Sequence, residues 1–296
     1  MKNENLRIIR FLVTFLIFPL IYMNSSQAQS NDDCMMCHED HDLSMEKQGK
    51  TISLFVENKI LNKSVHGEMD CIYCHEDAAV EDFPHPENLS PVNCGSCHPD
   101  AELKFNNGIH GRAKTKNSPY APDCKECHGK HDILASKLPE SRTYKMNIPV
   151  LCGNCHKEGS PVARIYNITE HNIVENYSQG IHGKGLYESG LFVTATCNDC
   201  HGNHFILPSK NRSSSVSTIN VAKTCMKCHI RIEQTHRKVI KSELWESKPG
   251  AVPACTSCHP PHKVQYQQQK QTISNTTCLK CHKEEEGKPQ IIKESG

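Results

Sequence analysis

The segment CKECHGKH, residues 124–131, has two cysteines three positions apart, a histidine directly after the second, and another histidine three positions further on. The segment CNDCHGNH, residues 197–204, repeats this arrangement. Two thiols at this spacing can each add to one of the two vinyl groups on a haem edge, and the imidazole of the next residue can then bind the iron. The pentapeptide C-x-x-C-H therefore predicts covalently attached haem c.

All 18 cysteines of the chain belong to such pentapeptides, which predicts about nine haems. The cysteines expected to form thioethers are Cys34, Cys37, Cys71, Cys74, Cys94, Cys97, Cys124, Cys127, Cys152, Cys155, Cys197, Cys200, Cys225, Cys228, Cys255, Cys258, Cys278 and Cys281. The histidines expected as proximal iron ligands follow directly: His38, His75, His98, His128, His156, His201, His229, His259 and His282.

Other uses of paired cysteines fit the sequence less well. Disulfides in an exported chain need an even number of cysteines, but they do not require a histidine after each pair. Structural zinc also uses C-x-x-C pairs, without need of a histidine at that position. Thioredoxin-like pairs occur singly in an α/β pattern, and no such pattern is evident here.

The histidines outside the pentapeptides mostly recur at fixed places in a repeated unit. A unit opens with a histidine, often in Ile-His-Gly, continues to C-x-x-C-H-x-x-H and ends with a plain C-x-x-C-H. These histidines can supply a second axial nitrogen, which predicts bis-histidine iron throughout. The distal candidates are His41, His66, His85, His110, His131, His182, His204, His236 and His262.

Ten histidines lie outside the pentapeptides, one more than the nine haems predicted, and His171 is expected to be redundant because it lies outside the repeat. Methionine is a further type of axial ligand, but beside a motif it usually only packs. The methionines in such places are Met36, Met69 and Met226.

Segment length constrains which histidine reaches which haem. His131 lies only three positions after His128, too near to reach the opposite face of the same ring. We therefore expect the histidines of this kind to ligate a neighbouring haem: His131, His204 and His262. His110 and His182 are expected over the far face of the haem that follows them. The N-terminal motif Cys34–His38 has its own candidate in His41.

The first residues are typical of an export signal. Lys2, Arg7 and Arg10 are positive, residues 11–22 are apolar, and residues 26–28 offer a cleavage site. The apolar stretch is short for a bilayer span, so we prefer cleavage to retention as a membrane anchor. The mature protein is expected in the periplasm or outside the cell.

The repeats divide the chain into segments. They are a signal peptide at 1–28, a monohaem module with linker at 29–62, dihaem units at 63–107, 108–160, 179–232 and 233–283, a linker at 161–178 and a charged tail at 284–296. Residues 51–61 are the best candidate for a strand or hairpin.

The composition predicts an unusual core. Aromatic residues make up 6% of the chain and the mean hydropathy is -0.58, so its own side chains offer little to bury. The predicted fold class is a multihaem cytochrome c, with mostly short α-helices and irregular loops around a haem stack, little β-structure and no conventional hydrophobic core. Removal of the expected signal peptide changes the net charge from +1 to about -1, which is too close to neutral for a nucleic-acid partner.

The strings SVHG at 64–67, IHGKGL at 181–186 and CNDCHGNH at 197–204 resemble bacterial multihaem cytochromes with doubled C-x-x-C-H motifs, loosely grouped with cytochrome c3 and NapC/NrfH-like proteins. The resemblance covers about residues 34–282. It implies an electron carrier that takes electrons from a membrane quinol dehydrogenase or cytochrome b-type donor. It also implies a periplasmic or outer-surface redox acceptor.

Bis-histidine iron has no open position for a substrate, so single-electron exchange is expected and no catalytic residue is required. One alternative is a multihaem reductase of the nitrite or hydroxylamine type, which needs a five-coordinate haem. Another is a subunit of a conducting cytochrome filament or complex. The oligomeric state stays open.

Overall fold

The computed structural model describes residues 30–47, 49–80, 83–166, 168, 170, 172–231 and 253–265. Outside them lie the expected signal peptide, the linker histidine His171, the distal candidate His236 and the last motif, 278–282. The chain forms two compact units. The first contains residues up to Asn58 with Glu68–Val92, and the second contains Lys59–Gly67 with the residues from Asn93 onward.

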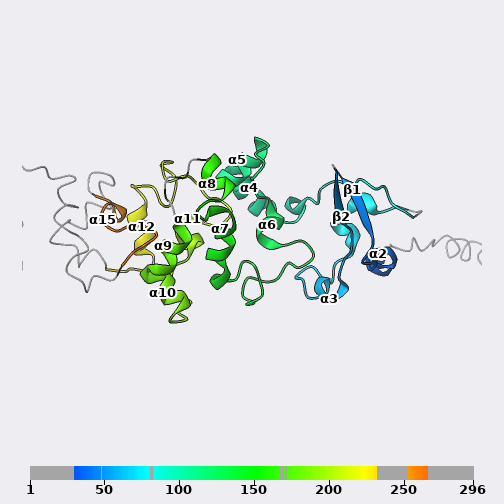
Figure 1. The fold of residues 1–296 in the computed structure, drawn as a ribbon, viewed down its shortest axis with the longest axis horizontal. Coiled ribbons are helices and arrows are strands. Elements are labelled where there is room, and N and C mark those ends of the chain that lie inside the picture. Colours follow the sequence, from blue (N-terminus) through cyan, green and yellow to red (C-terminus); the bar gives the residue numbers. More distant parts are fainter. Residues whose placement is uncertain are drawn as a thin grey trace, which may run out of the picture. The chain divides into compact units, whose positions relative to one another are not determined.

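The first unit contains α2 (Asn31–His38), β1 (Ser44–Lys47), β2 (Lys50–Ser53) and the 3-10 helices η2 (Cys71–Tyr73) and η3 (Glu76–Ala78) (Figure 1). The two strands are antiparallel, with Ser44 opposite Ser53 and Lys47 opposite Lys50. The expected strand at 51–61 therefore ends at Ser53, and its last residues form α3 (Asn58–Leu61) instead. Gly49 connects the strands at a φ of +72°, a conformation that glycine adopts readily.

The side chain of Asn31 joins the first two motifs. Its Nδ2 donates to the Met69 carbonyl at 3.1 Å, and its Oδ1 accepts from the Cys71 amide at 2.8 Å. Both groups of one amide thus hold the start of α2 against the start of η2.

The second unit is built from short helices. They are η4 (Cys94–Ser96), α4 (Pro99–Asn107), α5 (Ile109–Thr115), α6 (Cys124–His128), η5 (Lys145–Asn147), α7 (Ile148–His156), α8 (Pro161–Ile165), α9 (Ile173–Gln179), α10 (Ile181–Tyr187), α11 (Cys197–His201), α12 (Val221–Met226) and α15 (Cys255–Cys258). The α4–α5 and α9–α10 pairs are two copies of one arrangement, each with an extended glycine between its helices.

The glycine of Ile-His-Gly has a packing role in both copies. A Cβ at Gly111 would collide with the Phe105 carbonyl, and a Cβ at Gly183 would collide with the Tyr177 carbonyl. The missing side chain lets α5 approach α4, and α10 approach α9, closely enough to fix the direction of the intervening histidine.

Successive repeats are joined by equivalent backbone hydrogen bonds. The residue before an opening histidine donates its amide to a carbonyl two residues after a C-x-x-C-H-x-x-H segment. The bonds are Val65 to Ile133 at 2.8 Å, Ile109 to Ile206 at 2.7 Å and Ile181 to Val264 at 2.7 Å. Each opening histidine is therefore anchored to the first motif of the next repeat.

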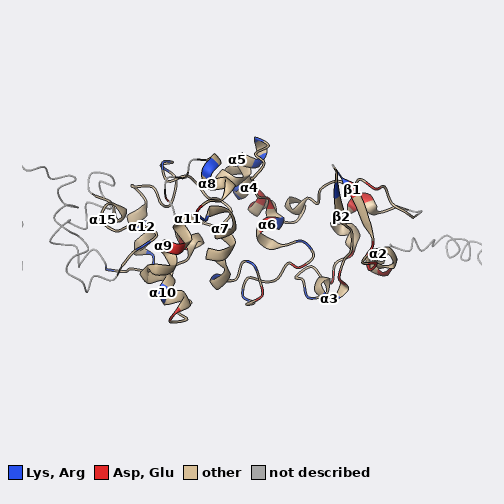
Figure 2. Cartoon of the chain, viewed as in Figure 1, with Lys and Arg blue, Asp and Glu red and all other residues tan. Residues whose placement is uncertain are grey.

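The two units bury few apolar side chains, and each buries its own. The buried apolar residues described are Met35, Ile148, Tyr177, Leu186, Leu207, Val221, Ala222 and Ala254. Short helices, loops and a two-stranded sheet make up the described structure, which confirms the predicted fold class. Charges of both signs are scattered along the elements (Figure 2). None of the helices in the described ranges is both long and apolar enough to cross a bilayer.

Candidate functional site

Histidine side chains of the described residues face one another in pairs. The distances between ring centres are 6.0 Å for His38–His85, 6.0 Å for His66–His98, 6.2 Å for His110–His156, 5.9 Å for His128–His204, 6.0 Å for His182–His229 and 6.0 Å for His201–His262. In every pair one histidine belongs to a pentapeptide and the other lies outside one. Each motif histidine in these pairs thus has its own opposing imidazole.

The spacing of these pairs fits an iron between the rings. Metal–nitrogen bonds of about 2.0 Å, with about 1.1 Å from each nitrogen to its ring centre, place the centres about 6.2 Å apart. Rings in direct contact come closer, as His41 and Phe55 do at 3.9 Å. The residues therefore fit haem iron held by two imidazoles.

The pairs reveal a rule for the repeats. An opening histidine faces the second motif of its own unit, as His110 faces His156 and His182 faces His229. A histidine three residues after a first motif faces the first motif of the preceding unit, as His204 faces His128. His262 and His201 follow the same rule.

This rule agrees with the expectation that His204 and His262 serve a neighbouring haem, but it corrects the expectation for His110 and His182. Those two histidines do not face the motif that directly follows them. Each faces the second motif of its unit. The position opposite His128 is taken by His204, because the Ile109–Ile206 hydrogen bond holds that segment at the start of α5.

The first motif also differs from expectation. His85, and not His41, faces His38, with the ring planes 3° apart. His41 stacks on Phe55. The reason is the one that applies to His131: a segment of three residues cannot pass around the ring edge to the opposite face. The His38–His85 pair also joins the expected segments 29–62 and 63–107.

Hydrogen bonds at Nδ1 orient several of these imidazoles. The Nδ1–H of His38 donates to the Leu54 carbonyl at 2.8 Å, and that of His85 donates to the Pro86 carbonyl at 2.9 Å. The Nδ1–H of His262 donates to the Glu170 carboxylate at 2.6 Å. Donation from Nδ1 leaves the Nε2 lone pair free for a metal.

Burial lowers the pKa of several histidines that lie in the motifs or face one. They are His75, His110, His128, His156, His182 and His201. A lowered pKa favours the neutral imidazole at neutral pH, which is the form that binds metal.

A family described as the doubled CXXCH motif matches residues 117–161 and 248–287. Comparison with curated proteins and with solved structures gave no match. The family match supports a multihaem c-type cytochrome. The first matched segment contains the motifs of α6 and α7, and the second begins with the motif of α15.

The thiols of successive motifs lie near each other. A hydrogen bond with Cys197, together with burial, raises the pKa of Cys152, and a bond with Cys255 does the same for Cys225. Burial and the nearby Cys152 raise the pKa of Cys127 to about 11. In the first unit, burial and Cys34 raise the pKa of Cys71 to about 11.

No disulfide joins any of the cysteines in the described ranges. In those ranges no three His, Cys, Asp or Glu side chains gather around a position for one ion. In the described residues the histidines thus lie in pairs, and each thiol pair lies near that of the next motif along the chain. Such a donor set suits a series of covalently attached haems.

Capping boxes start two of the motif helices, α6 and α11, at the first cysteine. The Asp123 carboxylate accepts from the Lys125 amide at 3.0 Å, and the Glu126 carboxylate accepts from the Asp123 amide at 2.7 Å. Thr196 and Asp199 form the same capping box on α11. This box satisfies amides that a helix otherwise leaves unpaired, so it fixes the spacing of the two thiols.

We predict that Asp123→Ala lowers the free energy of unfolding by about 1 kcal/mol, measured by denaturant titration. Burial opposes ionisation, but hydrogen bonds with Glu126 and Lys125 lower the pKa of Asp123 to about 2. The loss should therefore be full above about pH 4 and fade as the pH falls toward 2. Glu140→Ala, at an exposed position, is the control for charge. Equal losses for both variants would contradict the capping role.

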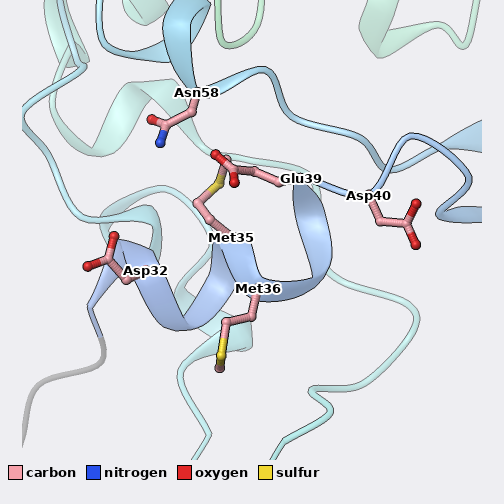
Figure 3. A pocket seen from close by; sticks show the side chains of 6 residues that line it. All are labelled: Asp32, Met35, Met36, Glu39, Asp40 and Asn58. Atoms are coloured by element: carbon pink, nitrogen blue, oxygen red, sulfur yellow. The ribbon is translucent and has the colours of Figure 1, made fainter.

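An open pocket beside α2 is lined by Asp32, Met35, Met36, Glu39, Asp40 and Asn58. Figure 3 shows Met35 directed toward Glu39 and Asn58, whereas Met36 points away from them. Met36 is 76% exposed, so this candidate ligand is directed to solvent.

Proposed function

We propose that the chain is an exported electron-transfer protein that carries about nine bis-histidine c-type haems. It relays single electrons from a membrane quinol dehydrogenase or cytochrome b-type donor to a periplasmic or outer-surface acceptor. The observation that carries this proposal is the set of histidine pairs, because each pair would supply both axial nitrogens of one iron.

Haem c supplies an iron that alternates between Fe(III) and Fe(II) by gaining or losing one electron. The cysteines of each motif tether the porphyrin, and the histidine pair holds the metal. Because both axial positions are filled by imidazole, the chain excludes substrate from the iron. A reductase would require one position to be open.

The order of the thiols supports a relay through the second unit. Hydrogen bonds join the thiols of Cys94 and Cys124, of Cys152 and Cys197, and of Cys225 and Cys255. The thiols of Cys127 and Cys152, and those of Cys200 and Cys228, are near enough to interact electrostatically. Consecutive motifs are therefore neighbours in space, from the motif at 94–98 to that at 255–259. This order would bring consecutive haems close enough for electrons to pass between them.

Intact mass and a pyridine haemochrome spectrum of the purified protein test the cofactor content. About nine haems per chain, with low-spin EPR signals and no binding of CO by the reduced protein, are the expected results. A colourless protein whose thiols bind zinc would overturn the proposal. A high-spin signal with CO binding in the unaltered protein would favour the reductase.

A further inference from the structure

Glu170 lies between α8 and α9, in a segment that the sequence suggested only as a linker. Its Oε1 accepts a hydrogen bond from Nδ1 of His262 at 2.6 Å, although the two residues are 92 positions apart in the chain. The side chain of His262 is 23% exposed and that of Glu170 is 39% exposed. His262 in turn faces His201 of α11. The carboxylate thus lies directly behind one imidazole of a pair.

The two residues that directly follow His262 are also held by hydrogen bonds. Lys263 Nζ donates to Gln179 Oε1 at 2.6 Å, at the end of α9. The amide of Ile181 donates to the Val264 carbonyl at 2.7 Å. The backbone bond of Val264 holds the chain two residues after His262, so Glu170 contacts an imidazole on an anchored segment.

His262 differs from His38 and His85 in the group that accepts the hydrogen bond of its Nδ1–H. Those two imidazoles donate Nδ1–H to the neutral backbone carbonyls of Leu54 and Pro86. A carboxylate is a stronger acceptor than a carbonyl, and its hydrogen bonds are shorter. It withdraws the Nδ1 proton further and makes Nε2 a more basic ligand.

We propose that Glu170 is a positioning and tuning residue that lowers the reduction potential of the haem held by His201 and His262. This inference rests on the proposed function. A more basic ligand stabilises Fe(III) relative to Fe(II). The haem still takes up one electron on reduction and transfers no atom, but its equilibrium with an external donor lies further toward the oxidised form.

The test is a potentiometric titration of the full chain, with dithionite as the reductant and the visible haem bands as the readout. Glu170→Gln keeps the shape of the side chain and a weaker acceptor, and Glu170→Ala removes the acceptor. One component of the titration should shift to higher potential, in the order wild type, Gln, Ala. For Ala we expect about a tenfold change in the reduction equilibrium, or about 59 mV for one electron.

Glu175→Gln is the matched control, because Glu175 is an exposed carboxylate on neighbouring α9. This substitution removes the same charge at a position that does not contact His262. We therefore expect the potentials of all components of the titration to shift by the same small amount. An equal shift for Glu175→Gln and Glu170→Gln would overturn the proposal. So would an unchanged titration for both Glu170 variants.

A second comparison separates the hydrogen bond from the charge of Glu170. In a His262→Met background no Nδ1–H exists, so adding Glu170→Gln should produce no further shift. A shift that persists there would assign the effect to charge alone and overturn the proposed route. The haem stays attached through Cys197 and Cys200 in all variants, and intact mass verifies this. Haem missing from the unaltered protein would instead contradict the proposed function.

Discussion

Replacing His85 by alanine is expected to convert one haem per chain from six-coordinate to five-coordinate, whereas replacing His41 is expected to leave coordination unchanged. His85 faces His38 across 6.0 Å, the distance that fits two imidazoles on one iron. His41 contacts Phe55 instead. The two histidines therefore differ completely in their relation to the first motif, although the sequence favoured His41.

EPR and CO binding distinguish these outcomes. His85→Ala should show a high-spin ferric signal and, after reduction, bind about one CO per chain, while the unaltered protein and His41→Ala bind none. Intact mass should be the same for the three proteins apart from the substitution, because the thioethers remain. CO binding by His41→Ala but not by His85→Ala would show that the structural pairing is wrong.

Replacing His110 by alanine is expected to make the haem of the motif at 152–156 five-coordinate. The haem of the nearer motif at 124–128 is expected to stay six-coordinate. The reason is that His110 faces His156 at 6.2 Å, whereas His204 faces His128. His110→Ala should therefore gain a high-spin signal and about one CO site per chain.

Removal of single haems identifies the open site. Adding Cys152→Ala and Cys155→Ala to His110→Ala should abolish CO binding, because the five-coordinate haem is no longer attached. Adding Cys124→Ala and Cys127→Ala should retain it. Intact mass must show one haem fewer in each case. The reverse result would support the simpler assignment of each opening histidine to the haem that follows it.

The capping boxes and the Ile-His-Gly segments show how much of the local structure is encoded in short strings. Asp123 and Thr196 directly precede a first cysteine and begin α6 and α11 there. Gly129 and Gly202 follow the motif histidines with φ of +97° and +84°, and these helices end there. Each of these effects acts within a few residues, so sequence spacing predicts it.

Glu170 had no signal in the sequence. It belongs to no repeat and stands in a segment read as a linker, yet it accepts the hydrogen bond of His262. A carboxylate far along the chain can approach any of several histidines, and only the tertiary structure selects one of them.

The sequence by itself determined the chemistry of this protein: two thiols and an imidazole within five residues act locally, whatever the rest of the chain does. It also determined that the chain could not build an ordinary apolar core. The tertiary structure decided which imidazoles face each other, because the partners come from distant segments that the hydrogen bonds Ile109–Ile206 and Ile181–Val264 bring together. Segment length excludes a partner that is too near, but it cannot choose among those within reach.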